Sequence, residues 1–202
     1  MNTRGYVPKF VLILTGLLLM SCLLPGMIPL NPTPTGPMPT MEKDANKVID
    51  ALTNNNYVPL GQLAEETYTE QDFAKPGTHT YTVTITDDKP TYFSYGWCTV
   101  DEPTLQENLQ HIKIALYFND KKLGTDVIHP LSFTSSKNQP CADFGVLMTD
   151  WQNGEYKLKS VATFDQKIND GMADYAAGDY ILEYDVTVKK AENTSQTPSP
   201  SP

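Results

Sequence analysis

Basic residues are scarce along this 202-residue chain. Its 15 Lys and Arg residues stand against 24 Asp and Glu, which gives a formal net charge of −9, and no run of basic residues is longer than a pair. Binding to nucleic acid depends on clustered positive charge facing the phosphates. Attraction to an anionic membrane surface depends on the same kind of cluster. The composition therefore argues against both of these electrostatic partners.

Motifs that carry catalysis are also lacking. The chain contains no G-x-S-x-G turn, no phosphate-binding glycine loop and no H-E-x-x-H pair. Its histidines, His79, His111 and His129, are far apart in the sequence, and we interpret them as solvated residues at strand ends rather than as zinc ligands. The sequence therefore predicts no catalytic residue, no metal and no cofactor. Paired carboxylates remain open as an alternative, because Asp and Glu are plentiful.

A hydrophobic run long enough to span a bilayer is lacking. A basic start, Arg4 and Lys9, precedes an apolar segment over residues 10–24. As a helix this segment would be about 22 Å long, against about 30 Å for a hydrocarbon core. A basic start followed by a short apolar segment is typical of a secretory signal. We interpret residues 1–21 as a signal peptide, and the alternative is an uncleaved anchor that extends to Leu30.

The apolar segment ends in Leu19-Met20-Ser21-Cys22. This tetrad resembles the lipobox of bacterial lipoproteins, although Met20 stands where a smaller residue is usual. The resemblance implies cleavage between Ser21 and Cys22 and attachment of a diacylglyceryl group to the Cys22 thiol. Two or more acyl chains hold a protein at a membrane where one does not. The expected location is therefore the extracytoplasmic face of a cell membrane, and a signal cut elsewhere is the alternative.

Cysteine is rare as well, with three residues in the chain. If Cys22 carries lipid, Cys98 and Cys141 remain and can pair outside the cytoplasm. Such a bridge would close a loop of about 44 residues and contribute about 4 kcal/mol in the chain-entropy model. Because Cys141 falls in an irregular stretch, residues 124–143, we expect the bridge to join a loop to a strand. Two buried free thiols are the alternative.

Composition divides the exported chain into a tether, one domain and a tail. Residues 22–41 hold six prolines and no charge, and such a segment is extended and cannot pack a core. Residues 191–202 are polar and rich in Pro and Ser, which is typical of a disordered tail. The intervening residues, 42–190, are enough for one domain with its own core.

The hydrophobic period changes once along this domain. Apolar residues at helical spacing predict a helix over residues 41–52, with Thr40 as N-cap and the 54–56 asparagine run at its end. Downstream, apolar and polar residues alternate with the period of two that indicates half-buried strands. These segments are 79–86, 93–98, 112–118, 144–151, 156–164 and 180–188, with a short helix expected over 103–110 and a short strand at 127–128. Asn153-Gly154 predicts a hairpin between the fourth and fifth segments.

Strands of this number and spacing favour two packed sheets, each with one apolar face. The predicted fold class is mainly β, an antiparallel β-sandwich with one short N-terminal helix. Residues 174–180 resemble the segment that enters a late strand in immunoglobulin-like and fibronectin III-like sandwiches, which place a tyrosine near a corner to bind backbone. Cys141 departs from the antibody cysteine pattern, so the resemblance implies the fold class and no specific family.

An acidic loop is a candidate cation site. Asp165, Asn169, Asp170 and Asp174 cluster around the Gly171 turn, and oxygen ligands at close spacing can bind calcium. The EF-hand pattern is not met, because apolar or amide residues stand at two of its ligand positions. The alternative is a turn in which these carboxylates bind their own backbone.

Aromatic residues offer a second candidate. Tyr92, Tyr95, Trp97 and Trp151 could together form a platform for a sugar or a peptide. Strand alternation places Trp97 in the core, whereas Tyr92, on the opposite face, is the predicted surface residue.

These features favour a membrane-anchored, extracytoplasmic lipoprotein that binds an envelope protein or polymer without catalysis. An anchored carbohydrate-active hydrolase that uses paired carboxylates is one alternative. The other is a structural spacer or assembly subunit of the cell envelope, which would associate with copies of itself.

Overall fold

The computed structural model describes residues 34, 36–64 and 68–192. The predicted signal peptide, Ser21, Cys22 and most of the tether lie outside the described residues, as do residues 193–202 of the tail. Within the described part of the chain, no helix combines the length and the apolar character that a membrane crossing requires.

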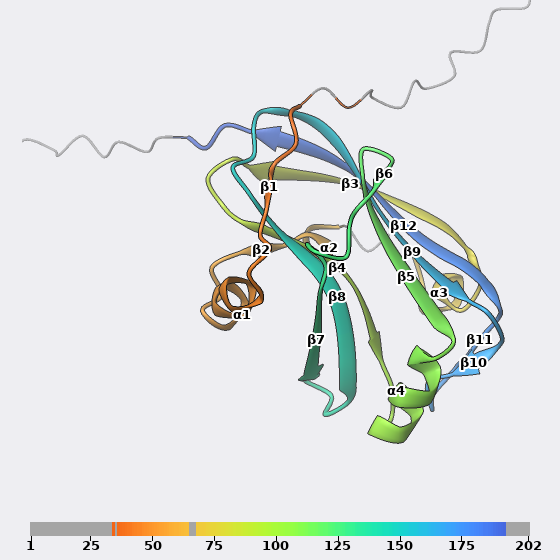
Figure 1. Cartoon of the computed structure of the whole chain (residues 1–202). Helices are drawn as coiled ribbons and strands as arrows, with labels where there is room; N and C mark the ends of the chain where they lie inside the picture. The colour runs from red at the N-terminus through yellow and green to blue at the C-terminus, as the bar shows by residue number, and fades with distance from the viewer. Residues whose placement is uncertain (1–33, 35, 65–67, 193–202) are drawn as a thin grey trace, which may run out of the picture. The chain divides into compact units, whose positions relative to one another are not determined.

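Two five-stranded sheets face each other and bury their apolar sides between them (Figure 1). The first sheet has the order β1 (Thr40–Met41), β8 (Pro140–Thr149), β4 (Thr91–Cys98) and β2 (Val58–Pro59), with β7 (His129–Thr134) also paired to β8. The second has the order β3 (Gly77–Thr86), β12 (Gly178–Lys189), β9 (Gly154–Phe164), β5 (Ile112–Phe118) and β6 (Lys121–Lys122). β10 (Ile168–Asn169) and β11 (Asp174–Tyr175) form a separate ribbon. The predicted mainly-β sandwich is confirmed.

The sheets are mixed rather than purely antiparallel, which corrects the sequence prediction. β3 runs parallel to β12 along its whole length, from Gly77 to Thr86, and β2 runs parallel to β4. A parallel pair needs a long connection, and β3 and β12 lie at opposite ends of the domain sequence. Strand alternation shows which face is buried but not which distant strand becomes the neighbour.

The Asn153-Gly154 turn does not form the predicted hairpin. β8 belongs to the first sheet, whereas β9 pairs with β5 and β12 in the second. The chain between them crosses from one sheet to the other, and Trp151, which belongs to this connection, is buried with 2% of its surface exposed. The prediction was wrong because an Asn-Gly pair specifies a tight turn and not the sheet to which the next strand belongs.

The stretch 124–143 is more regular than predicted. It contains the whole of β7 and the start of β8, and residues 127–128 precede β7 without forming a strand. Pro130 lies inside β7, where a missing N–H is tolerated because β7 pairs with β8 alone among the described strands. The proline therefore marks an edge strand rather than an irregular segment.

Helices are more numerous in the described residues than the two expected from the sequence, over 41–52 and 103–110. They are α1 (Ala45–Thr53), α2 (Leu60–Leu63), α3 (Glu70–Phe73) and α4 (Glu102–Leu109), of which α4 was expected within one residue. α1 begins after Asp44, whose carboxylate accepts a hydrogen bond from the Asn46 N–H at 2.9 Å. Thr40, the predicted N-cap, lies in β1 instead. Aspartate is among the strongest N-caps, which explains the later start.

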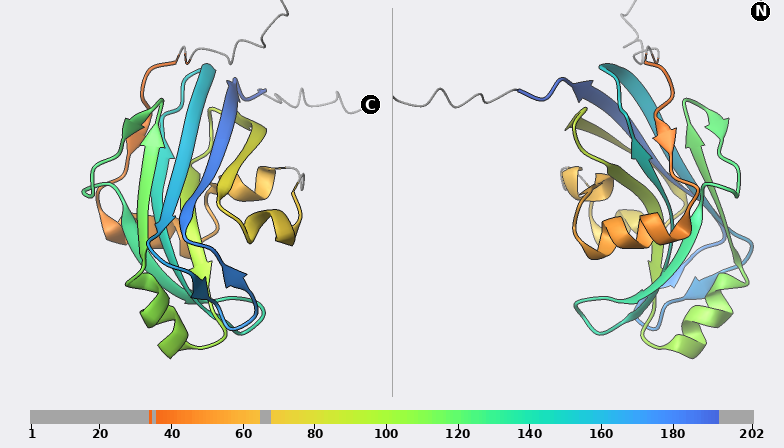
Figure 2. Two further views of the ribbon diagram at one scale, coloured as in Figure 1. Left: turned by 90° about the vertical axis from the view of Figure 1, so that its right-hand side faces the viewer. Right: turned by 60° about the vertical axis from the view of Figure 1, so that its left-hand side comes forward.

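The first sheet is covered on both faces, unlike a simple sandwich sheet. Its inner face joins the main core, in which Phe93 and Val146 are buried. Its outer face carries a smaller cluster of Val48 from α1, Tyr92 from β4 and Leu147 from β8. Figure 2 shows α1 lying against this outer face. The outer cluster is the part of the fold that forms the candidate site.

Candidate functional site

A groove of about 620 Å³ lies on the outer face of the first sheet, between α1 and β7. Its walls and floor are Ile49, Leu52, Thr53 and Tyr57 from α1 and the segment after it, Tyr92 from β4, Pro130, Leu131, Ser132 and Phe133 from β7, and Asp143 from β8. The walls are largely apolar, and the described lining residues include a single carboxylate, that of Asp143. The groove is thus an apolar channel with one acidic group at its floor.

Strand register positions the floor. β4 and β8 are antiparallel, with Ser94 opposite Gly145 and Gly96 opposite Asp143. The ring of Tyr92 fills the space that a side chain at Gly145 would need. Because Gly96 and Gly145 have no side chains, a neighbouring side chain can lie flat along the outer face of the sheet. A larger residue at either position would prevent this.

Tyr92 is buried, contrary to the prediction that it would be a surface residue. Its exposed fraction is 6%, because α1 covers this part of the sheet and Tyr57 packs edge-on against it with ring centroids 5.9 Å apart. Trp97, predicted to be in the core, is buried. Alternation assigned both side chains to the correct faces, but no local pattern showed that a helix would cover the outer face.

Asp143 lies in an environment that disfavours its charge. Burial raises the pKa of the Asp143 carboxyl above its usual range, and hydrogen bonds from the Ser94 hydroxyl and the Phe144 N–H offset part of that increase. The Tyr92 hydroxyl also lies against this carboxylate and opposes the increase in its pKa, although its position is outside ordinary hydrogen-bond geometry. Burial, and secondarily the charge of Asp143, raises the pKa of Tyr92. The carboxylate is therefore incompletely compensated by its neighbours.

The groove walls expose unusually large apolar side chains. Ile49 on α1 is 45% exposed, and Phe133 on β7 is 51% exposed. β7 is also an edge strand, and edge strands present backbone groups to which another chain can pair. Apolar walls, an edge strand and one carboxylate together suit an extended chain that carries apolar side chains and a positive charge.

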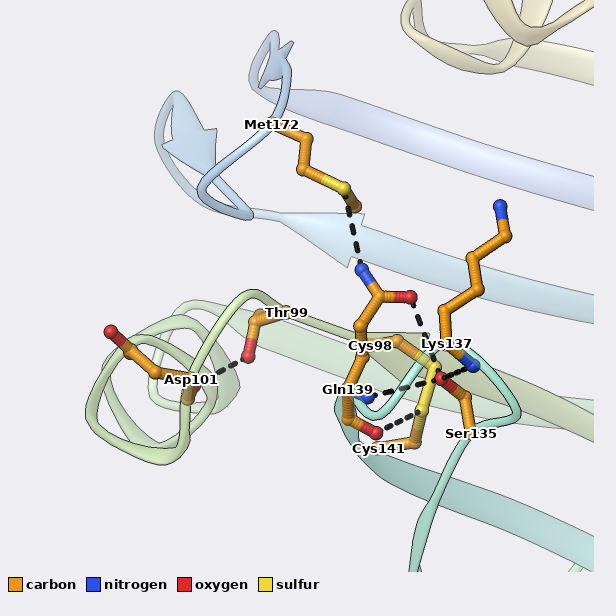
Figure 3. Close-up of a disulfide and its surroundings, with 8 residues drawn as sticks. All are labelled: Cys98, Thr99, Asp101, Ser135, Lys137, Gln139, Cys141 and Met172. Carbon is orange, nitrogen blue, oxygen red and sulfur yellow. Dashed lines mark hydrogen bonds between the residues drawn. A yellow bond between two sulfur atoms is a disulfide. The ribbon is translucent and has the colours of Figure 1, made fainter.

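The disulfide lies on the same outer face (Figure 3). Cys98 and Cys141 stand opposite each other on β4 and β8, with sulfur atoms 1.99 Å apart and Cα atoms 4.1 Å apart. The predicted pairing is present, but it joins two neighbouring strands rather than a loop and a strand, because β8 begins at Pro140. The bridge holds the register that sets Gly96 opposite Asp143.

The acidic loop uses its oxygens within its own turn. The Asp170 carboxylate, in a residue only 4% exposed, accepts hydrogen bonds from the N–H groups of Met172 and Ala173 and from the Tyr175 hydroxyl. Asp174 pairs with Lys167 at 2.8 Å, and Asp165 lies 2.9 Å from the ring of His111. Over residues 36–64 and 68–192, no three or more His, Cys, Asp and Glu side chains gather as metal ligands would.

The remaining predicted residues do not converge on one site. His79 and His129 are buried, with 6% and 8% of their surfaces exposed, which corrects the prediction that they are solvated. The His129 ring lies 3.0 Å from the Glu42 carbonyl oxygen, so it ties β7 to the segment before α1. Trp151 lies in the main core, away from Trp97. The four aromatic residues therefore do not form a single platform.

Sequence reasoning missed Asp143 and the groove walls. The signal for Asp143 was present, since it breaks the run of small and apolar residues from Ala142 to Met148 on what proves to be the outer face of β8. No signal could have shown that Ile49 and Phe133, more than 80 residues apart in the sequence, flank the same groove.

Comparison with known proteins gives distant structural similarity only. No family model and no curated protein matches the sequence. PbICP-C, solved in complex with falcipain-2, matches with 10% identity and a TM-score of 0.35, over 66% of this chain and 99% of that one. EhICP2, a cysteine protease inhibitor from Entamoeba histolytica, matches with 9% identity and a TM-score of 0.31, over 66% and 95%. Neither similarity is close enough to identify a function.

Proposed function

We propose that this protein is a non-enzymatic binding module, held at the extracytoplasmic face of a membrane by lipid on Cys22. Its partner is a protein whose extended, apolar segment carries one basic side chain and docks in the groove between α1 and β7. The lipobox resemblance of residues 19–22 supports the anchor, and the lining of the groove supports the binding role.

The Asp143 carboxylate carries the proposal. A partly buried carboxylate lowers the stability of a fold unless it is well compensated, and the hydrogen bonds of Asp143 offset the cost of its burial only in part. A basic side chain entering the groove would supply the missing charge and form a charge-assisted hydrogen bond. The net charge of −9 would also favour encounter with a basic segment.

The edge strand β7 supports an extended conformation of the partner. A peptide can add to an exposed sheet edge through backbone hydrogen bonds while its alternate side chains enter neighbouring pockets. The exposed ring of Phe133 and the side chain of Leu131 flank such a path.

Binding is favoured over hydrolysis at this groove. Glycoside hydrolysis uses two carboxylates on either side of the scissile bond. The described lining of the groove supplies only Asp143. A spacer role does not account for a carboxylate placed in an apolar groove, so the binding role explains more of the structure.

Selection from a displayed random peptide library tests the proposal, with the mature chain carrying Cys22→Ser as the target. The selected peptides should share a basic residue flanked by apolar ones. Asp143→Asn should weaken their binding about tenfold to a hundredfold, the value of a hydrogen bond to a charged group. The control is Asp88→Asn, an exposed residue of the β3–β4 turn that does not line the groove. Peptides without a basic residue, or equal binding to the Asp143→Asn variant, would contradict the proposal.

A further inference from the structure

A second cavity, of about 240 Å³, is formed by residues from α3, β3, β4, β11 and β12. Rings dominate its lining, from Phe73, His79, Tyr95, Trp97, Tyr175 and Tyr180. No Lys, Arg, Asp or Glu is among its described lining residues. This aromatic pocket is separate from the groove, because the two share no lining residue.

Three of these rings lie at steep angles to one another. Trp97 and Tyr175 have ring centroids 4.8 Å apart at an interplanar angle of 74°, and Tyr175 and Tyr180 have centroids 6.4 Å apart at 65°. The Tyr175 hydroxyl donates to the Asp170 carboxylate, and the Tyr180 hydroxyl donates to the Ala176 carbonyl oxygen at 2.9 Å. These hydrogen bonds fix both rings and commit their polar ends.

With the hydroxyls of Tyr175 and Tyr180 committed, the pocket offers a ligand few polar groups, one of which is the buried Trp97 Nε1–H, without a hydrogen-bond partner in the described structure. On binding, a sugar would lose the hydrogen bonds that its hydroxyls make with water. The pocket would replace few of them, so binding would be costly. Two kinds of ligand need few hydrogen bonds, a neutral apolar molecule and a quaternary ammonium ion, which has no N–H group.

A negative charge near the pocket favours the cation. The buried Asp170 carboxylate accepts a hydrogen bond from the hydroxyl of Tyr175, whose ring lines the pocket. Aromatic faces attract quaternary ammonium groups, and enclosing rings are the usual way in which proteins bind them. We propose that the aromatic pocket binds a small quaternary ammonium ligand of the choline class. A cavity of about 150 Å³ holds benzene, so this pocket is large enough for a ligand of similar or slightly larger size.

A matched pair of probes tests the charge directly. Choline chloride is titrated against the mature chain carrying Cys22→Ser and Trp151→Phe, so that Trp97 is the fluorescent reporter, with potassium chloride as the ionic-strength control. The second probe is dimethylbutanol, the neutral isostere in which carbon replaces the nitrogen. Choline should change the Trp97 emission with saturation and bind at least about tenfold more tightly than the alcohol. Equal affinity for the two probes, or no saturable change with choline, would overturn the proposal.

Two variants of Tyr175 separate the ring from its hydroxyl. Tyr175→Phe keeps the ring and should retain choline binding, whereas Tyr175→Leu removes it and should weaken binding about threefold to thirtyfold. Thermal unfolding establishes that each variant is folded, and Asp88→Asn, which removes an exposed charge from a residue that lines neither cavity, should leave choline binding unchanged. If Trp151→Phe does not fold, the indole N–H resonances of the Cys22→Ser chain replace fluorescence, and only that of Trp97 should shift. Choline binding that survives Tyr175→Leu unchanged would also overturn the proposal.

Discussion

Asp143 projects from the outer face of β8 between two glycine positions, Gly96 across the strand pair and Gly145 two residues along. A Cβ atom at Gly96 would come within 3.3 Å of the Asp143 Oδ1 atom. Small neighbours therefore let the carboxylate lie low on the sheet, where burial raises its pKa. The Tyr180 hydroxyl donates a hydrogen bond to the Ala176 carbonyl oxygen, four residues upstream. A tyrosine that binds backbone in this way is what the resemblance of residues 174–180 to immunoglobulin-like entry segments implies.

Asp143→Asn should stabilise the protein at neutral pH. Because burial raises the pKa of Asp143 in the folded state, its favourable contribution is fully present below the unfolded pKa of about 3.9 and is lost as the pH rises through the folded-state pKa. The neutral amide of the Asp143→Asn variant avoids that loss. The free energy of unfolding of the variant should therefore exceed that of the parent chain, and the difference should be larger at about pH 7 than at about pH 3. Urea denaturation at both pH values measures the difference. A variant that is less stable at neutral pH than the parent would contradict the expected cost of the charge.

At the scale of elements, the pairing of β4 with β8 determines the site. Their register sets Asp143 between the glycines, and the Cys98–Cys141 bridge lies two residues from Asp143 along β8. α1 then covers one end of the pair through Val48, and β7 borders the other side. The groove exists because α1 covers only part of the outer face and β7 borders the part left uncovered.

Removal of the bridge should cost more stability than a single surface contact. Cys98 and Cys141 are 43 residues apart, so the chain-entropy model predicts that Cys98→Ser with Cys141→Ser lowers the free energy of unfolding by about 4 kcal/mol. Urea denaturation with and without reductant measures this loss, and reductant should not affect the double variant. Cys22→Ser is the matched control, since it removes a thiol and leaves the bridge intact. Equal stability of the parent and the double variant would show that the bridge does not constrain the unfolded chain.

At the scale of the whole molecule, the proposed anchor and the domain would have separate tasks. Removal of residues 1–21 would leave 13 basic and 24 acidic residues, a formal net charge of −11. A chain so acidic would be repelled by anionic headgroups, so attachment to a membrane would depend on lipid. Of the proline-rich residues 22–41, Thr40 and Met41 form β1 of the sandwich, and the residues before them would then hold it away from the surface.

The lipid anchor is tested by the intact mass of the protein purified from its native membrane. The expected mass is that of a chain beginning at Cys22 plus acyl groups. Cys22→Ser should lose the acyl mass, because the predicted acyl groups are attached through the Cys22 thiol. A mass that corresponds to a chain retaining Met1, or to a chain that begins at another residue and carries no lipid, would contradict the anchor. The binding groove would then have to act in another compartment.

Prediction from the sequence succeeded where a pattern is local. Alternation identified the six longest strands, β3, β4, β5, β8, β9 and β12. It placed Phe93, Trp97 and Leu116 on buried faces, because side chains along a strand alternate between its two faces. The sequence also predicted the pairing of Cys98 with Cys141, because these two cysteines remained once Cys22 was assigned to lipid. It failed at β7, where Pro130 concealed an edge strand, and at the start of α1, where Asp44 provides the cap.

The sequence by itself determined the fold class, the buried face of most strands and the two cysteines that pair. Only the tertiary structure decided that β3 lies parallel to β12, that β8 and β9 belong to different sheets, and that α1 buries Tyr92. It also decided that Ile49, Phe133 and Asp143 border one groove. The physical reason is that alternation and turn chemistry act over a few residues, whereas sheet neighbours and covering helices are selected by the apolar surface that distant segments bury together.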